Sequence, residues 1–384
     1  MLVSAWAVCV TVMKNPSFIP EYAELQCYSH YTFLRGASAP EQLVQRAAKL
    51  GYHSLAITDE CTLAGVVKAH VEAKKLGLKL LIGSQIRITP EDGSPAFMLL
   101  ILAMNKNGYG NLSELITVAR TRSEKGSYLA RPRDIAEPVG ELAHLKGLPD
   151  CQLILAPEYG ITYEKLERQA AWLLQCAPGR ARIAITLHHR VHDDIHKAVV
   201  QAVADEYGLP VTATGDVCMH VRSYKTIQDT MTAIRHGIPV AQCGYRLAPN
   251  AEQHLRSRLR LGNLYSRAAL NETILVASLC TFSLDELKYE YPDELVPPGS
   301  TPTSYLRAES YIGAHWRYPA GIPANVQAQL EHELQLIEEM QYESYFLTVY
   351  DIVRFARTQR ILCQGRGSFL SREINRSNSS AAKK

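Results

Sequence analysis

Ser54-Leu55-Ala56-Ile57-Thr58-Asp59-Glu60 carries the pattern that decides the fold, because a short apolar run ends directly in two carboxylates. Similar runs recur along the first part of the chain, at Ala23–Tyr28, Ser54–Thr58, Leu80–Ile88, Ala96–Ala103, Gln152–Ala156, Arg182–Leu187 and Pro210–Thr214. Amphipathic stretches with helical periodicity lie between them, such as residues 163–175 and 195–207. Short strands that alternate with helices predict an α/β fold with a parallel sheet, built either as a barrel or as a doubly wound sheet.

Polar residues at the strand ends choose between these two architectures. They lie at or just past the carboxyl ends of four different runs, as Asp59 and Glu60, Gln85, His188 and His189, and Asp216 and Cys218. A doubly wound sheet would concentrate such residues at one crevice. Contributions from many strand ends are typical of a barrel whose active site lies at its carboxyl rim, so we expect a distorted (β/α)7 barrel.

Length and composition limit the classes of protein to which the chain can belong. A chain of 384 residues exceeds the usual single core, and 47% hydrophobic with 21% charged residues is typical of a globular protein. No apolar run has the length of a membrane span, so we expect no membrane association. Nine cysteines without a Cys-x-x-Cys pair indicate reduced thiols and therefore a cytoplasmic protein.

The helical and apolar patterns divide the chain into five parts. We expect an N-terminal extension at residues 1–21, a barrel domain at 22–240, and a helical connector with a Pro-punctuated linker at 241–302. A mostly helical segment follows at residues 303–368, in which residues 324–360 form a long stretch broken near Tyr342–Ser344. Residues 369–384 are polar, rich in Ser and Asn and without apolar periodicity, which predicts a disordered tail.

Two carboxylate positions are the best candidates for metal ligands. Asp59 with Glu60, and Asp216, follow strands, where carboxylates can hold divalent ions that activate water for phosphoester hydrolysis. Asp also caps helices routinely, and the sequence leaves both interpretations open. His192 and His196 have the i, i+4 spacing of a zinc pair, but they also suit an ordinary helix start.

A phosphate-handling motif lies near the C-terminus, where a helical stretch runs into the turn Gly365-Arg366-Gly367-Ser368. Glycines let backbone N–H groups approach an anion, and a guanidinium binds phosphate oxygens in bidentate fashion. The basic residues Arg354, Arg357 and Arg360 repeat at helical spacing ahead of this turn, so they are candidates for contacts with DNA phosphates. A glycine C-cap is the simpler explanation of the turn taken alone.

Four stretches taken together resemble one family. They are residues 23–38 (AELQCYSHYTFLRGAS), 56–65 (AITDECTLAG), 215–220 (GDVCMH) and 345–357 (YFLTVYDIVRFAR) running into CQGRGS. In order and spacing they are similar to bacterial C-family DNA polymerases, in particular the error-prone, damage-tolerance relative of the DNA polymerase III alpha subunit. The resemblance covers residues 22–368. It implies a polymerase-and-histidinol-phosphatase (PHP) barrel at 22–240 and the beginning of the polymerase palm and thumb at 303–368.

The resemblance also implies residue roles, and it shows a damaged metal site. The family's opening His-x-His falls on Gln26 and Tyr28, and its strand-end Glu falls on Gln85. The ligands that remain are Asp59, Glu60, His188 or His189, Asp216 and Cys218. A multi-metal centre needs several charged or imidazole donors at once, so we expect the PHP metal site to be lost. In the palm the resemblance assigns the incoming triphosphate to Gly365, Arg366, Gly367 and Ser368.

The resemblance predicts the N-terminal portion of an error-prone DNA-directed DNA polymerase that acts in damage tolerance and repair. It implies Mg²⁺, DNA and deoxynucleotides, with other damage-tolerance or replication proteins as further partners. In the family the catalytic aspartates follow the glycine turn, whereas here Glu373 is the sole acidic residue after Ser368. We therefore expect a truncated and inactive polymerase. The alternatives are a stand-alone PHP-type phosphoesterase or 3′-exonuclease, which should keep the ligands lost here, and a non-catalytic interaction module.

Overall fold

The computed structural model describes residues 19–287 and 296–363, and these form parts of two compact units, Met1–Leu287 and Lys288–Lys384. Residues 1–18 of the extension expected at 1–21, the turn at Gly365–Ser368 and the tail at 369–384 lie outside the described residues, so the predictions that concern them stay predictions.

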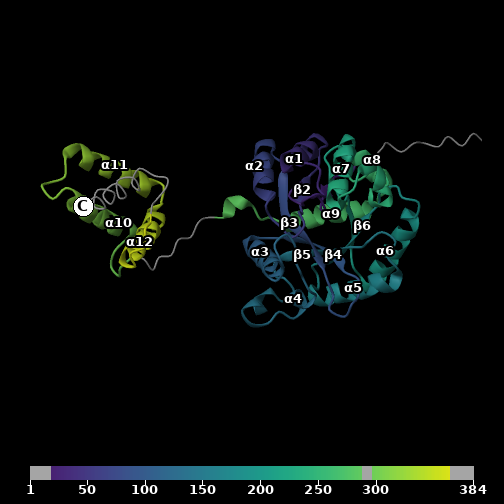
Figure 1. Ribbon diagram of the computed structural model, residues 1–384. Helices are drawn as coiled ribbons and strands as arrows, with labels where there is room; N and C mark the ends of the chain where they lie inside the picture. The colour runs from purple at the N-terminus through teal and green to yellow at the C-terminus, as the bar shows by residue number, and fades with distance from the viewer. Residues whose placement is uncertain (1–18, 288–295, 364–384) are drawn as a thin grey trace, which may run out of the picture. The chain divides into compact units, whose positions relative to one another are not determined.

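The first unit contains a 7-stranded sheet in the order β1 to β7 (Figure 1). The strands are β1 (Ala23–Glu24), β2 (Ser54–Ile57), β3 (Lys79–Ile88), β4 (Phe97–Ala103), β5 (Cys151–Ala156), β6 (Ala181–Thr186) and β7 (Val211–Thr214). Beyond β1 and β7 the backbone pairs again, since Tyr28 N–H donates to Val217 O and Val217 N–H donates to Gln26 O, both at 2.9 Å. These bonds bring the first and last strands together and nearly close the sheet, which confirms the predicted barrel.

One strand departs from the parallel arrangement expected from the sequence. β4 pairs antiparallel with both β3 and β5, while the other neighbouring strands are parallel. The physical reason is the connection: residues 89–96 join β3 to β4 without a helix, and a parallel pair needs a longer crossover. The prediction of an all-parallel sheet was therefore wrong at β4.

Helices surround the sheet on its outer face (Figure 1). They are α1 (Pro40–Lys49), α2 (Val66–Leu76), α3 (Lys106–Thr121), α4 (Arg133–Ala136), α5 (Tyr163–Cys176), α6 (Asp193–Tyr207) and α7 (Lys225–His236), with short 3-10 helices at Gly140–Leu145, Arg222–Tyr224, Val240–Gln242, Gly244–Arg246 and Leu284–Glu286. Alternate strand residues form two cores: Leu99 and Leu153 pack outward with the helices, and Leu100 and Ile154 pack inside the barrel. Burial on both faces explains why these strands read as continuous apolar runs.

α8 (Arg258–Leu264) and α9 (Arg267–Leu279) extend the first unit beyond the boundary expected near residue 240. Val276 and Ala277 of α9 join the inner core, and Thr273 Oγ1 accepts a hydrogen bond from Ala23 N–H at the start of β1. α9 therefore packs at the amino end of the barrel. Part of the segment expected to be a connector belongs to the same compact unit, which runs to Leu287.

The second unit is helical in its described part, 296–363. Its helices are α10 (Pro302–Arg317), α11 (Ala324–Glu339) and α12 (Glu343–Thr358), and the break between α11 and α12 lies where the sequence predicted it. A small core joins them, formed by Leu306, Leu334, Ile337 and Leu347. α10 lies almost entirely within the segment predicted to be mostly helical, but its first residue was assigned to the Pro-punctuated linker, although Thr301 caps the helix and Pro302 is the first helical residue.

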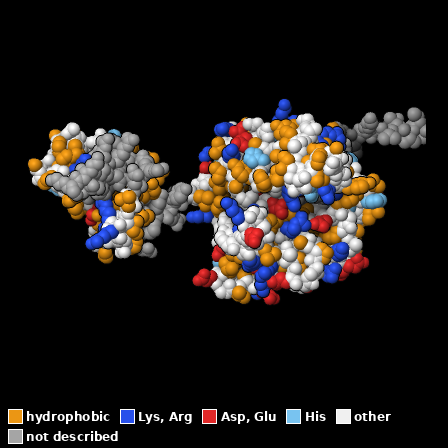
Figure 2. Space-filling view, in the orientation of Figure 1, with side chains coloured by type: hydrophobic (Ala, Val, Ile, Leu, Met, Phe, Trp, Pro, Cys, Tyr) orange, Lys and Arg blue, Asp and Glu red, His pale blue; other side chains and the backbone are white. Residues whose placement is uncertain are grey.

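On the face of the barrel unit seen in Figure 2, acidic and basic side chains are interspersed with hydrophobic ones, so this face carries no broad electrostatic field of one sign. Within residues 19–287 and 296–363, no helix is both long and apolar enough to span a membrane.

Candidate functional site

The carboxyl rim of the barrel brings together polar side chains that follow different strands. Gln26 follows β1, Gln85 lies in β3, and Asp216 follows β7. Gln26 Nε2 donates to Gln85 Oε1 at 3.3 Å and to Asp216 Oδ1 at 3.1 Å. The amide of Gln26 therefore links three strand ends by hydrogen bonds.

Asp59 follows β2 and is almost fully buried, with 1% of its surface exposed. Its Oδ1 accepts from Ser29 N–H at 2.7 Å and from Thr32 Oγ1 at 2.9 Å, and its Oδ2 accepts from Ser29 Oγ at 2.9 Å. Burial raises the pKa of the Asp59 carboxyl, and the hydrogen bonds from Ser29 oppose that rise. Both of its oxygens are therefore engaged by the loop after β1.

Glu60, the next residue, is also held by protein partners. Its Oε2 lies 3.0 Å from Arg35 Nη1, and its Oε1 accepts from the Tyr128 hydroxyl at 2.7 Å. A guanidinium so close to a carboxylate occupies the position that a cation bound there would need. Glu60 thus acts here as an anchor for Arg35.

The segment after β7 shows the same kind of engagement. Asp216 Oδ2 accepts from Gln253 Nε2 at 2.6 Å, and burial raises the pKa of this carboxyl while that hydrogen bond opposes the rise. Asp216 has a φ of 44°, a left-handed conformation that Asp tolerates better than most residues. Cys218 is fully buried, and burial raises the pKa of its thiol well above the usual range, so the thiolate needed for metal binding is disfavoured.

The histidines separate into a buried and an exposed group. His188 follows β6, is 4% exposed, and its Nε2 donates to Gly215 O at 2.8 Å. Burial lowers the pKa of His188 to about 4, so the ring is neutral at physiological pH. His189 is exposed beside it, whereas His192 is the N-cap of α6 and His196 is buried within that helix.

These side chains do not fit the multi-metal centre that the resemblance implies. The carboxylates of Asp59, Glu60 and Asp216 already accept hydrogen bonds or pair with arginine, and Gln26 and Gln85 contribute neutral amides. Among residues 19–287 and 296–363, no three His, Cys, Asp or Glu side chains are placed to share a metal ion. Gln26 Oε1 is a buried acceptor without a partner, but one neutral oxygen is too weak a ligand for such a centre.

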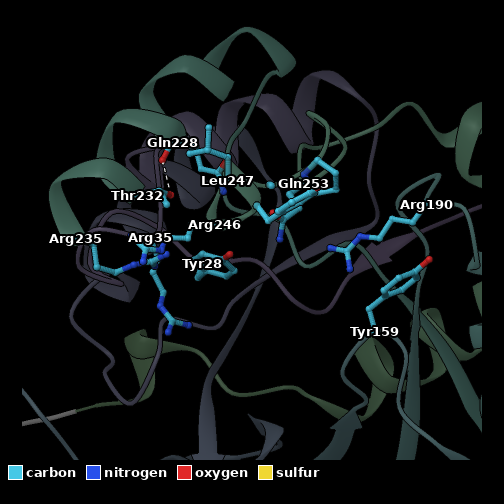
Figure 3. A pocket seen from close by; sticks show the side chains of 13 residues that line it. Tyr28, Arg35, Tyr159, Arg190, Gln228, Thr232, Arg235, Arg246, Leu247 and Gln253 are labelled. Atoms are coloured by element: carbon cyan, nitrogen blue, oxygen red, sulfur yellow. Dashed lines mark hydrogen bonds between the residues drawn. The ribbon is translucent and has the colours of Figure 1, made fainter. Parts of the chain in front are cut away.

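A cavity of about 540 Å³ opens beside this rim. Tyr28 and Gln253 line both the rim and the cavity, and the cavity lining also includes four arginines, namely Arg35, Arg190, Arg235 and Arg246. Figure 3 shows Arg35 and Arg235 on one side of Tyr28, and Arg190 with Tyr159 on the other. None of these arginines was a predicted site residue, because they lie far apart in the sequence and share no motif.

The DNA-contact candidates lie in the second unit. Arg354 and Arg357 are on α12, Arg360 follows it with a φ of 56°, and all three are exposed. Arg354 Nη2 lies 2.6 Å from Asp351 Oδ1, so its charge is partly balanced within the helix. The structure therefore leaves Arg357 and Arg360 as the more available cations of the three.

Comparison with known proteins identifies both units. Residues 24–189 match the PHP domain, and residues 304–374 match the bacterial DNA polymerase III alpha NTPase domain. An error-prone DNA polymerase of Bordetella parapertussis is 56% identical over 92% of this chain, and one of Burkholderia mallei is 51% identical over 91%. A solved structure from Bifidobacterium adolescentis, assigned as a metal-dependent phosphoesterase, covers 51% of this chain and 88% of its own at 17% identity, with a TM-score of 0.36.

The matches cover only part of the length of each relative. The alignments cover 34% of the length of each of these two polymerases, so the chain spans about a third of the relatives that it matches. Within that span the identity is high, and the two matched domains follow each other in the order that the sequence motifs predicted. Over 92% of its length, this chain is similar to a bacterial error-prone DNA polymerase, and it contains a PHP domain followed by a match to the bacterial DNA polymerase III alpha NTPase domain.

Proposed function

We propose that this chain is part of an error-prone DNA-directed DNA polymerase, a nucleotidyltransferase that synthesises DNA in damage tolerance and repair. The observation that carries the proposal is the 56% identity to such a polymerase over 92% of the chain. In this proposal the PHP barrel is a scaffold and the second unit begins the polymerase domain. DNA and deoxynucleotides are the substrates.

The rim chemistry supports a scaffold rather than a phosphoesterase. Asp59, Glu60 and Asp216 already accept hydrogen bonds or pair with Arg35, and the amides of Gln26 and Gln85 cannot replace charged ligands. We therefore propose that the rim holds no metal cluster, and that Mg²⁺ acts only in the polymerase domain. Nothing in the rim favours the rival phosphoesterase.

The second unit contributes cationic contacts in this proposal. Arg357 and Arg360 are exposed at the end of α12, directly ahead of the turn at residues 365–368. Guanidinium groups there can bind DNA phosphates, and Gly365, Arg366, Gly367 and Ser368 would hold the triphosphate of the incoming nucleotide. Such contacts weaken steeply as salt concentration rises.

Nucleotidyl transfer needs two metal ions held by carboxylates in line with the triphosphate. After Ser368 these 384 residues contain one acidic residue, Glu373. We predict that the 384-residue polypeptide binds primed DNA but does not extend it. The measurement is a primer-extension assay with Mg²⁺ or Mn²⁺, run beside a fluorescence-anisotropy titration of the same DNA.

The variant Arg366→Ala sharpens this test. Template-dependent extension that this substitution abolishes would show that carboxylates elsewhere in the chain complete the site. Absence of any salt-dependent DNA binding would count against the proposed function as a whole. The matched control is Arg168→Gln, an exposed arginine on α5 of the barrel unit, which should leave DNA binding unchanged.

A further inference from the structure

The cavity beside the rim collects positive charge from segments that are distant in sequence. Arg35 comes from the loop after β1, Arg190 from the loop after β6, Arg235 from α7, and Arg246 from the 3-10 helix Gly244–Arg246. The cavity volume of about 540 Å³ falls within the range of about 300–1,000 Å³ typical of small-molecule sites. We call it the arginine pocket.

The charge of this pocket is largely unbalanced. Arg35 pairs with Glu60 at 3.0 Å. In the part of the chain that the structure describes, Arg190, Arg235 and Arg246 have no carboxylate within salt-bridge distance. Arg35 and Arg235 line the same side of the pocket (Figure 3). Burial lowers the pKa of Arg235 and the charge of Arg35 lowers it further, while the charge of Glu60 opposes this. Three of the four arginines thus have no carboxylate partner at salt-bridge distance among the described residues, and like charges gathered around one cavity favour the binding of an anion.

Arg190 is positioned as a binding group. Its guanidinium carbon lies 4.5 Å from the centre of the Tyr159 ring, a stacking contact that fixes the side chain. Its Nε is buried and has no hydrogen-bond partner. Figure 3 shows the guanidinium directed from the Tyr159 side toward Tyr28 and Gln253. A buried, unsatisfied donor at a pre-oriented cation is a position that an anionic oxygen would fill.

We propose that the arginine pocket binds a phosphoryl group without a metal ion, supplied either as inorganic phosphate or as the terminal phosphate of a DNA strand. A phosphoryl group carries up to two charges and three acceptor oxygens, and arginine forks match its geometry. A carboxylate offers a single charge and would leave most of the pocket unbalanced. This inference goes beyond the polymerase function, because every residue it uses lies in the barrel unit.

The experiment is isothermal titration calorimetry of the full chain with inorganic phosphate, in chloride buffer that contains EDTA. We expect saturable binding with a Kd of about 1 mM or tighter. The double variant Arg190→Gln/Arg246→Gln should weaken binding at least about tenfold, since it removes two charge-assisted contacts. Arg168→Gln, on the exposed face of α5, is the matched control and should bind as the wild type does.

Two further titrations distinguish the sources of the phosphoryl group. A tetranucleotide with a 5′-phosphate is compared with the same tetranucleotide ending in a 5′-hydroxyl. Tighter binding of the phosphorylated strand than of inorganic phosphate supports a strand end as the ligand, and equal binding supports the free anion. Equal affinity for both tetranucleotides, unchanged in the double variant, would overturn the proposal.

Other outcomes also count against it. Absence of saturable phosphate binding overturns it, and so does binding that EDTA abolishes, because a metal would then be the acceptor. Since Arg190 stacks on Tyr159, circular dichroism and thermal unfolding are measured for each variant. Arg246→Gln alone changes an exposed side chain without a carboxylate partner among the described residues, so it keeps the test valid if the double variant unfolds.

Discussion

At the scale of single residues, the chemistry of the rim depends on the type of nitrogen or oxygen that each position offers. Gln26 Nε2 carries protons and donates to Gln85 and Asp216, so it engages atoms that would otherwise be available to a metal. A histidine there would offer a lone pair instead. Neutral amides thus replace ion coordination by hydrogen bonding, which keeps the strand ends together without a metal.

This leads to a prediction about restoring the metal site. The wild-type chain should hold well under roughly one Mn²⁺ or Zn²⁺ per molecule and should not hydrolyse phosphoesters, because a cluster needs several charged donors. The variant Gln26→His/Tyr28→His should behave the same way, since Gln85 would still contribute no charge. Inductively coupled plasma mass spectrometry gives the metal content, and p-nitrophenyl phosphate turnover gives the activity. Two or more metals per chain, together with phosphatase or 3′-exonuclease activity, would favour the rival phosphoesterase.

Only part of the site is accessible to sequence reasoning. Gln26, Asp59 and Asp216 could be placed at one rim because strand ends are visible as the ends of apolar runs. The saturation of Asp59 by Ser29 and Thr32 could not, since it depends on the path of a loop. The arginine pocket was missed entirely, because its members meet only once the barrel has closed.

At the scale of elements, α3 offers a matched pair of glycines for a stability test. Gly110 is exposed in the helix, and a Cβ added there meets nothing within 4 Å. A Cβ at Gly108 would lie 1.9 Å from the backbone oxygen of Asp150. We predict that Gly110→Ala raises the free energy of unfolding by about 0.5–1 kcal/mol, because alanine is the better helix former.

Gly108→Ala should have the opposite effect, lowering the free energy of unfolding by about 1–3 kcal/mol, as overpacking typically does. Urea unfolding followed by circular dichroism measures both changes from the shift of the midpoint. If Gly108→Ala also raised the urea midpoint, α3 would not pack closely against the loop before β5 at this position.

The elements also show where sequence reasoning is strong and where it is weak. Every strand of the barrel was visible in the sequence, because strands buried on both faces leave long apolar runs. The direction of β4 was not visible in the sequence, since it depends on the path by which residues 89–96 connect β3 to β4. The start of α10 was assigned to the linker because Pro302 reads as a helix breaker, although proline is well suited to the first helical position.

At the scale of the whole molecule, the chain consists of two compact units, each with its own core. Leu153 is fully buried in the outer core of the barrel, and Leu347 is 1% exposed in the core of the helical unit. A unit with its own core can unfold without the other. The two leucines therefore form a matched pair for testing whether the units are independent.

We predict that Leu153→Ala and Leu347→Ala each lower stability by about 2–5 kcal/mol, but in one unit only. Hydrogen exchange read by mass spectrometry separates the effects, because opening free energies are measured for each segment. Leu153→Ala should accelerate exchange in β4, β5 and β6 and leave α12 unchanged, since the lost methyl groups contact only the barrel core. Leu347→Ala should accelerate exchange in α10, α11 and α12 and leave the strands protected. Faster exchange in both units after either substitution would mean that the chain unfolds as one cooperative body. The boundary between residues 287 and 288 would then not separate two independently unfolding units.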